Sequence, residues 1–182
     1  MSKDVEYYAF RQDLYFYDLV SSFSVSLCGC PAIFDTQIPF FLSPQQNLSF
    51  PGQFTSAKHM NPYSLRRLAE LEQIDKGAHI AWCCIMLANT AYESVRRFHD
   101  GSPEFEFFRH IRNASSHLNV FQFNHREPAH PAMWRTAVID DRLKGEDNPL
   151  FGQQCFGSFL GVADLLDLLM DIERKIIIQL QQ

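Results

Sequence analysis

Hydrophobic residues recur at three- and four-residue steps along most of this chain, a spacing that predicts α-helices. The clearest run lies between Pro62 and Phe98, and Gly77 marks the point where this helix would bend or split. An earlier helix is predicted from the N-terminus to about residues 28–31, and a last one over the C-terminal region. The apolar side of that last helix consists of Phe159, Val162, Leu165, Leu166, Leu169, Ile172, Ile176 and Leu180.

A further helix is predicted from about Pro103 to Leu118, and its start is well marked. Gly101 ends the preceding helix, Ser102 caps the new one and Pro103 takes its first position. The apolar stripe is formed by Phe107, Ile111, Ala114 and Leu118. At about 100° per residue, the rest of the helix is polar and carries Arg109, Arg112, Asn113, Ser116 and His117.

Two segments lack a helical period. Residues 28–61 are rich in Pro, Gln, Ser, Asn and Phe, which predicts a long loop insertion. Its apolar residues indicate that it packs down, as a flap over the core or as part of a dimer contact. Residues 134–143 alternate loosely, so a short strand or hairpin arm is expected before the last helix. The predicted fold is all-α: one domain over 1–182, an up-and-down bundle of about four long helices.

Composition and charge add further expectations. The 17 Phe residues predict a core of large aromatic side chains. The net charge of −5 means that overall electrostatics would not hold the chain on nucleic acid, so such a role needs a local basic patch. One stretch without Lys contains Arg96, Arg97, His99, Arg109, His110, Arg112, His117, His125, Arg126, His130 and Arg135. Because Arg suits phosphate and His titrates near neutral pH, nucleic-acid chemistry would lie in this stretch.

The expected location is the cytoplasm, without membrane association. Asp4 and Glu6 lie where a signal peptide would have its basic and apolar regions. The longest apolar run noted, 78–91, is too short to span a bilayer. The five Cys residues are odd in number and follow no disulfide framework, which indicates a reducing compartment.

Metal and cysteine chemistry find little support in the sequence. Cys28 and Cys30 lack a second matching pair, so no zinc site is expected there. The adjacent pair 83–84 lies in so apolar a helix that buried, inert thiols are expected. His125 and His130 could be ligands or substrate contacts, although a polar loop explains them equally well. No glycine-rich phosphate loop is present, and no metal or cofactor is expected.

The residues best suited to chemistry lie on the predicted helix 103–118. Arg112 is followed by Asn113, and His117 comes after four intervening residues. This arrangement resembles the signature of the HEPN superfamily, in which an Arg, a polar neighbour and a His lie late in a helical bundle. The resemblance implies a metal-independent endoribonuclease, of the kind found among toxins and antiphage effectors, whose site is assembled from two protomers.

The physical chemistry of these residues is compatible with that resemblance. Residues five apart on an ideal helix point about 140° apart, so Arg112 and His117 could not hold one phosphate on a single helix. A symmetric homodimer would pair each Arg112 with the His117 of the other protomer, or place both pairs around one cleft. His117 would serve as general base or acid, Arg112 would stabilise the phosphate and Asn113 would hold the geometry. Arg109 and Ser116, also on this helix, would be weaker substrate contacts.

Two other interpretations stay open. The chain could be a HEPN domain that no longer cleaves and instead provides a dimerisation or regulatory surface, for example to a nucleotidyltransferase antitoxin. Alternatively, His117 could be a packed residue and Arg112 a solvated one, with no chemical role. The deciding observation is whether their polar groups open onto a basic cleft or are bound inside the fold.

Overall fold

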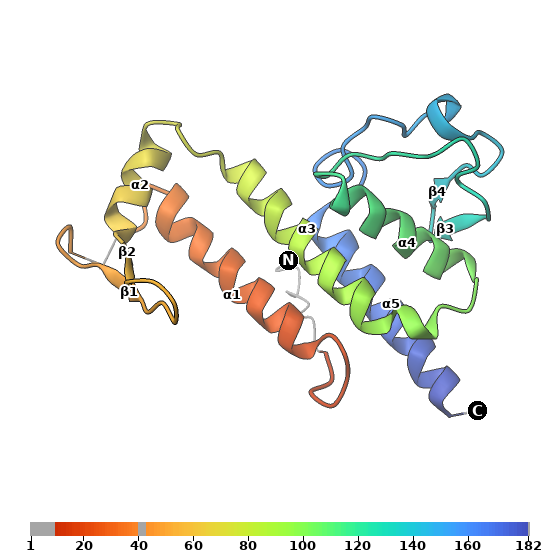
Figure 1. The fold of residues 1–182 in the computed structure, drawn as a ribbon, viewed down its shortest axis with the longest axis horizontal. Helices are drawn as coiled ribbons and strands as arrows, with labels where there is room; N and C mark the ends of the chain where they lie inside the picture. The colour runs from red at the N-terminus through yellow and green to blue at the C-terminus, as the bar shows by residue number, and fades with distance from the viewer. Residues whose placement is uncertain (1–9, 40–42, 182) are drawn as a thin grey trace, which may run out of the picture. The chain divides into compact units, whose positions relative to one another are not determined.

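The computed structural model describes residues 10–39 and 43–181 of the chain (Figure 1). The described part contains five α-helices and two small antiparallel sheets, with about 51% helix and 9% strand. The elements are α1 (Tyr17–Phe34), β1 (Leu48–Phe50), β2 (Lys58–Met60), α2 (Pro62–Glu70), α3 (Lys76–Val95), α4 (Pro103–Ser116), β3 (Ala132–Trp134), β4 (Ala137–Ile139) and α5 (Val162–Leu180). Short 3₁₀ turns occupy Arg96–Phe98 and Gly145–Asp147.

The prediction of an all-α bundle of four long helices is wrong, because the fold is mixed α/β. The β3–β4 hairpin lies close to the strand or hairpin arm expected at 134–143. The β1–β2 hairpin lies inside 28–61, where only a loop was expected, and pairs Leu48 with Met60. Strands of three residues are too short for a hydrophobic period to reveal them.

The chain divides into two compact units. One comprises Met1–Phe23 and Ala81–Gln182, and the other comprises Ser24–Ile80. Helices α1 and α3 each contribute residues to both. Compact units of this kind occur within single domains as well as between domains, so one domain over 1–182 stays a prediction.

In the unit 24–80, the helix boundaries differ from those expected. Helix α1 continues to Phe34 with Pro31 inside it, although the predicted helix ended at 28–31. Pro31 lies in the last turn, so its ring interrupts the hydrogen bonding of α1 only near the end of the helix. The long helix predicted from Pro62 is split, but upstream of Gly77: the side chain of Asp75 accepts from the backbone N–H of Ala78 at 2.5 Å and thereby caps α3.

The remainder of this unit packs less than its apolar residues suggest. Phe50 and Phe54 are 49% and 92% exposed, so the expectation that they pack down is wrong. Phe40 and Phe41 lie outside the described residues. The segment after α1 is held to α2 through the buried Arg66, whose guanidinium donates to the backbone carbonyls of Thr36 and Ile38 at 2.8 Å each.

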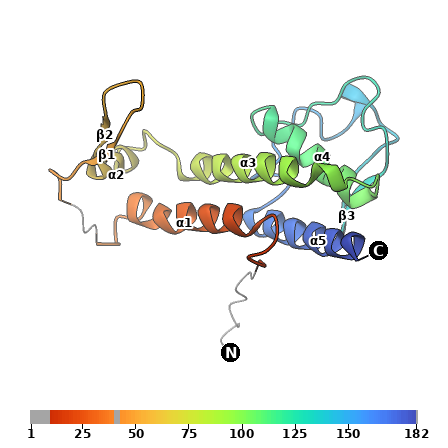
Figure 2. The same ribbon diagram turned by 60° about the horizontal axis from the view of Figure 1, so that its bottom comes forward.

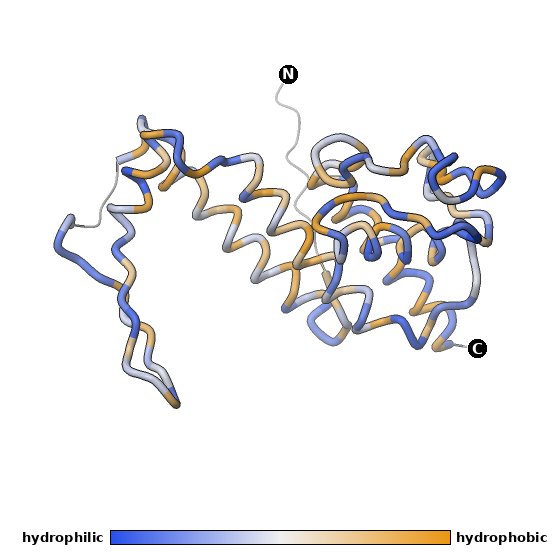
Figure 3. Tube along the Cα trace, turned by 45° about the horizontal axis from the view of Figure 1, so that its top comes forward, coloured by the Kyte–Doolittle hydropathy of each residue, from blue (hydrophilic) through white to orange (hydrophobic). Residues whose placement is uncertain are grey.

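The unit containing 81–181 has the hydrophobic core. Helices α3 and α5 each bury one side, whereas α4 is buried around most of its circumference and packs against both β3 and α5 (Figure 2). Along α3 and α5 the trace alternates between hydrophobic and hydrophilic residues (Figure 3), as one buried side requires. Phe107 contacts Trp134 and Phe159, with ring centroids 6.1 and 6.0 Å away. These contacts confirm the predicted aromatic core.

The N-terminal part of the chain departs from expectation in two ways. Residues 10–16 form turns before α1 and are not helical, while residues 1–9 lie outside the described part. Helix α1 is also long and apolar enough, by length and composition, to cross a membrane, and 17% of its residues are buried. The same properties occur in core helices of globular proteins and in signal sequences, so they are weak evidence for a membrane span.

Candidate functional site

Helix α4 positions every residue that the sequence singled out. Ser102 takes an extended backbone conformation at the N-cap and Pro103 follows as the first helical residue, which confirms the predicted start, but the Ser102 side chain makes no capping hydrogen bond. The helix ends at Ser116, two residues earlier than expected. The backbone N–H of His117 still donates to the carbonyls of Asn113 and Ala114, each at 3.1 Å.

The chain turns sharply after His117. Leu118 and Asn119 have φ angles of 56° and 71°, in the left-handed region. Leu118 is 71% exposed, so its placement in the apolar stripe is wrong. Asn119 is buried, and its side chain donates to the Phe156 carbonyl at 2.9 Å and accepts from the Phe156 N–H at 2.7 Å. This pair of hydrogen bonds fixes the turn next to His117.

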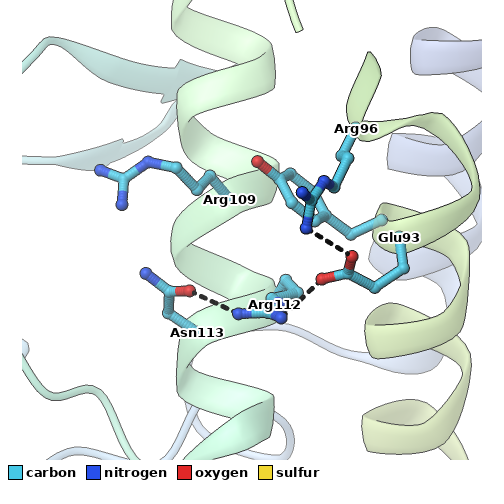
Figure 4. Close-up of a pocket in the computed structure, with 6 residues that line it drawn as sticks. Glu93, Arg96, Arg109, Arg112 and Asn113 are labelled. Atoms are coloured by element: carbon cyan, nitrogen blue, oxygen red, sulfur yellow. Dashed lines mark hydrogen bonds and ion pairs between the residues drawn. The ribbon is translucent and has the colours of Figure 1, made fainter. Parts of the chain in front are cut away.

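A pocket of about 260 Å³ opens between α3 and α4. Three of the predicted residues, Arg109, Arg112 and Asn113, line it (Figure 4). The other wall comes from the end of α3 and the 3₁₀ turn that follows. Its residues are Tyr92, Glu93 and Arg96.

Arg112 lies across the pocket between the two helices. Its guanidinium donates to Glu93 Oε1 at 2.5 Å and to Asn113 Oδ1 at 3.3 Å, and lies 5.9 Å from the centre of the Tyr92 ring. Its Nε is buried without a hydrogen-bond partner among the described residues. The side chain is 33% exposed, so Arg112 is neither fully solvated nor enclosed in the core.

Glu93 joins Arg112 to a second arginine. Its Oε2 accepts from Arg96 at 3.2 Å, while its Oε1 accepts from Arg112 (Figure 4). Desolvation works to raise the pKa of Glu93, but the hydrogen bonds and charges of Arg112 and Arg96 outweigh it and lower the pKa below its ordinary value. Glu93 is therefore an anion at neutral pH, shared by two guanidinium groups.

Arg109 is bound on all sides by protein groups. It donates to Glu106 at 2.8 Å and to Glu127 at 3.0 Å, and one of its nitrogens lies 3.1 Å from His110 Nε2. Because arginine only donates, that histidine nitrogen accepts and the ring is neutral. Burial first, and then the charge of Arg109, lower the pKa of His110 to about 3. Arg109 thus connects α4 to the loop carrying Glu127.

His117 and Ser116 lie outside the lining of this pocket. The Ser116 hydroxyl donates to Asn89 Oδ1 of α3 at 2.8 Å. His117 is exposed directly after the C-terminal end of α4. Within one chain, the structure therefore brings together Arg109, Arg112 and Asn113, but not His117.

The sequence did not predict three of the residues that line the pocket. Tyr92 and Glu93 were not expected at a functional site because both fit an ordinary amphipathic helix. Arg96 was counted only as part of the basic stretch. The usable signal was the spacing of Glu93 and Arg96, since residues three apart on a helix are neighbours. The partner helix, which supplies Arg112, could not be read from that spacing.

The competing sites remain weak. Cys30, Cys83, Cys84 and Cys155 are buried, and burial raises the pKa of Cys84 to about 12, which confirms the expected inert thiols of that helix. No group of three or more His, Cys, Asp or Glu side chains in residues 10–39 and 43–181 is arranged to hold a metal ion. His125 and His130 are both exposed on the loop after α4.

Comparison of the chain with models of protein families, with curated proteins and with solved structures found no match.

Proposed function

We propose that this chain is a HEPN-like endoribonuclease that cleaves RNA without a metal ion, as a homodimer. The observation that carries the proposal is the placement of Arg112 on α4 and of His117 directly after its end. Arg112 directs a permanently charged guanidinium into an open pocket, and His117 presents an exposed imidazole at the end of the same helix. These are the two groups that metal-free RNA cleavage requires.

Each group has a distinct chemical role in this proposal. His117 takes the proton from the attacking 2′-hydroxyl or returns one to the leaving oxygen, a contribution of about 10²–10⁴-fold. Arg112 binds the phosphoryl oxygens and stabilises the negative charge that grows on them. Asn113 holds the guanidinium of Arg112 through its Oδ1, at 3.3 Å. The products carry a 2′,3′-cyclic phosphate.

The separation of the two groups supports a dimeric site. His117 does not line the pocket that Arg112 enters, so one chain alone does not place an acid or base beside the bound phosphate. In a twofold dimer, the exposed His117 of one protomer can face the Arg112 pocket of the other. The proposed setting is cytoplasmic, in a toxin–antitoxin or antiphage system, with an antitoxin protein as a further partner.

One observation favours the alternative of a binding module that does not cleave. Glu93 already neutralises Arg112, and Glu106 and Glu127 neutralise Arg109. A domain in this state could serve as a dimerisation or regulatory surface for a nucleotidyltransferase or another regulator. The ion pair of Arg112 with Glu93 thus favours a binding module, whereas the exposed imidazole of His117 favours a nuclease. An activity assay distinguishes the two functions.

The test is RNA cleavage by purified protein in the presence of EDTA. Wild type is compared with Arg112→Ala and with His117→Ala, and His125→Ala serves as the matched control because His125 is exposed on the loop after the same helix. The proposal requires that wild type and His125→Ala cleave and leave cyclic phosphate ends, while the other two variants do not. Equal activity of all four proteins, or inactivity of all four, would contradict it.

A further inference from the structure

The pocket beside Arg112 contains more arginine charge than carboxylate charge. Arg109 is already paired with two carboxylates of its own, Glu106 and Glu127. Arg96 and Arg112, by contrast, share the single carboxylate of Glu93. In the part of the chain that the structure describes, neither has a second carboxylate within ion-pair distance. Arg96 and Arg112 therefore have one carboxylate between them, although the second carboxylate on Arg109 balances the charge of the cluster as a whole.

The two guanidinium groups converge on the same small volume. One oxygen of Glu93 accepts from Arg96 at 3.2 Å, and the other accepts from Arg112 at 2.5 Å (Figure 4). Arg96 comes from the 3₁₀ turn after α3 and Arg112 from the middle of α4, so two separate elements aim their charge at one anion. This is the arrangement that binds a phosphoryl group, whose several oxygens accept from more than one arginine.

We infer that Arg96 and Arg112 together bind one phosphoryl group, and that Glu93 occupies its place until a phosphate displaces it. The ligand is a phosphate ester oxyanion. Its identification with RNA, either the backbone or a phosphorylated end, rests on the proposed function. Arg96 is then a second phosphate ligand, and Glu93 is an internal competitor that sets how strongly the pocket binds anions.

The contacts around the pocket allow this exchange. The side chains of Arg96 and Glu93 are 68% and 41% exposed, and ion pairs in contact with water are weak. Arg112 keeps its other contacts when Glu93 leaves, because Asn113 and the Tyr92 ring do not depend on that carboxylate. A phosphate monoester at an RNA end carries more negative charge than a carboxylate, and a backbone phosphodiester carries the same single charge. Both present oxygens that can accept from Arg96 and Arg112 together in the place of Glu93.

The experiment is a titration of the full chain with inorganic phosphate, followed by NMR of the arginine side chains. Arg96→Ala is expected to weaken binding about tenfold, the loss of one charge-assisted hydrogen bond. Glu93→Gln is expected to tighten it about tenfold, because two exposed ion pairs no longer compete. The matched control for the first is Arg97→Ala, since Arg97 contacts Tyr15 and Phe98 instead of the pocket. The control for the second is Asp167→Asn, which releases Arg135 elsewhere on the surface.

The controls are expected to bind phosphate within about twofold of wild type, because neither Arg97 nor Asp167 lines the pocket and interactions between exposed charges are weakened by water and salt. The inference is overturned if Arg97→Ala loses as much affinity as Arg96→Ala, if Glu93→Gln does not bind more tightly, or if neither wild type nor Glu93→Gln binds phosphate. Far-ultraviolet circular dichroism of each variant shows that it is folded before titration.

A second titration distinguishes a backbone phosphate from a terminal phosphate as the ligand. It also distinguishes failure of this inference from failure of the proposed function. In a His117→Ala background, short RNA with a 5′-phosphate is compared with the same RNA ending in a hydroxyl. Equal, Arg96-dependent binding assigns the site to the backbone, and preference for the phosphorylated RNA assigns it to the end. Arg96-dependent binding without any cleavage by wild type leaves this inference standing and removes the proposed function. If wild type cleaves RNA, and Arg96→Ala changes neither cleavage nor RNA binding, the proposed function stands and this inference is removed.

Discussion

Asn119→Ala is expected to destabilise the turn that follows His117. Asn119 is buried at a φ of 71°, and its amide makes two hydrogen bonds to the backbone of Phe156, at 2.9 and 2.7 Å. The Cys155 N–H also donates to the Asn119 carbonyl, at 2.8 Å. The residue therefore joins the end of α4 to the loop before α5. Alanine removes the two side-chain hydrogen bonds and leaves two backbone groups of the buried Phe156 without those partners.

The magnitude follows from these contacts. A buried backbone group left without its partner costs about 1–3 kcal/mol. The left-handed conformation costs Ala about 1 kcal/mol more than it costs Asn or Gly. With two such groups, the free energy of unfolding should fall by about 3–7 kcal/mol in total. For a chain of this size, that corresponds to a decrease in melting temperature of roughly 6–28 °C. Asn119→Gly, which relieves only the backbone strain, should recover about 1 kcal/mol of the loss.

The assay is urea unfolding followed by circular dichroism, with Asn124→Ala as the control. Asn124 is exposed and accepts one hydrogen bond from the Arg126 N–H at 2.9 Å, so its replacement should cost about 1 kcal/mol or less. If Asn119→Ala were no less stable than Asn124→Ala, the assignment of Asn119 as the residue that fixes the turn would be refuted. RNA cleavage by Asn119→Ala should also fall, because the same turn positions His117.

Two further predictions concern buried polar groups. Arg66→Ala removes the donors to the carbonyls after α1, so amide hydrogen exchange at residues 32–38 should accelerate at least about tenfold. The side chain of Arg67 is 62% exposed, so Arg67→Ala should leave this exchange unchanged. For His110, burial and Arg109 hold the pKa near 3 in the folded chain, against 6.5 ordinarily. Below pH 6.5 the unfolded chain therefore binds a proton that the folded chain does not, and stability falls with decreasing pH. Relative to His110→Gln, wild type should lose about 1.4 kcal/mol per pH unit between about pH 6 and pH 4, and parallel stability curves for the two proteins would contradict this.

The sequence predicted α4 well because its signals are local. Gly101 has a φ of 76°, as expected for a residue that ends a helical turn, and Ser102 and Pro103 start the helix where the sequence places them. Phe107 and Ile111 are fully buried, as their spacing indicates. Cap and periodicity are properties of neighbouring residues, so they can be read without knowledge of the fold.

The sequence could not predict the features that depend on contacts between residues far apart in the chain. The pocket depends on α3 and α4 lying side by side, which brings Glu93 beside Arg112, 19 residues along the chain. The exposed hairpin at 48–60 is held by backbone pairing, which hydrophobic periodicity cannot predict. The expected separation of His117 from Arg112 rested on ideal helix geometry, whereas in the structure His117 follows the end of α4 and does not line the pocket.

The claim most in need of a direct test is that the site combines Arg112 of one protomer with His117 of another. Arg112→Ala and His117→Ala proteins with different affinity tags are co-expressed, and the mixed dimers are purified through both tags in turn. Each mixed dimer contains one intact Arg112 and one intact His117 on opposite protomers, so we expect RNA cleavage to return although each variant alone is inactive. If the doubly purified dimers stay inactive while wild type cleaves RNA, the two-protomer site is contradicted.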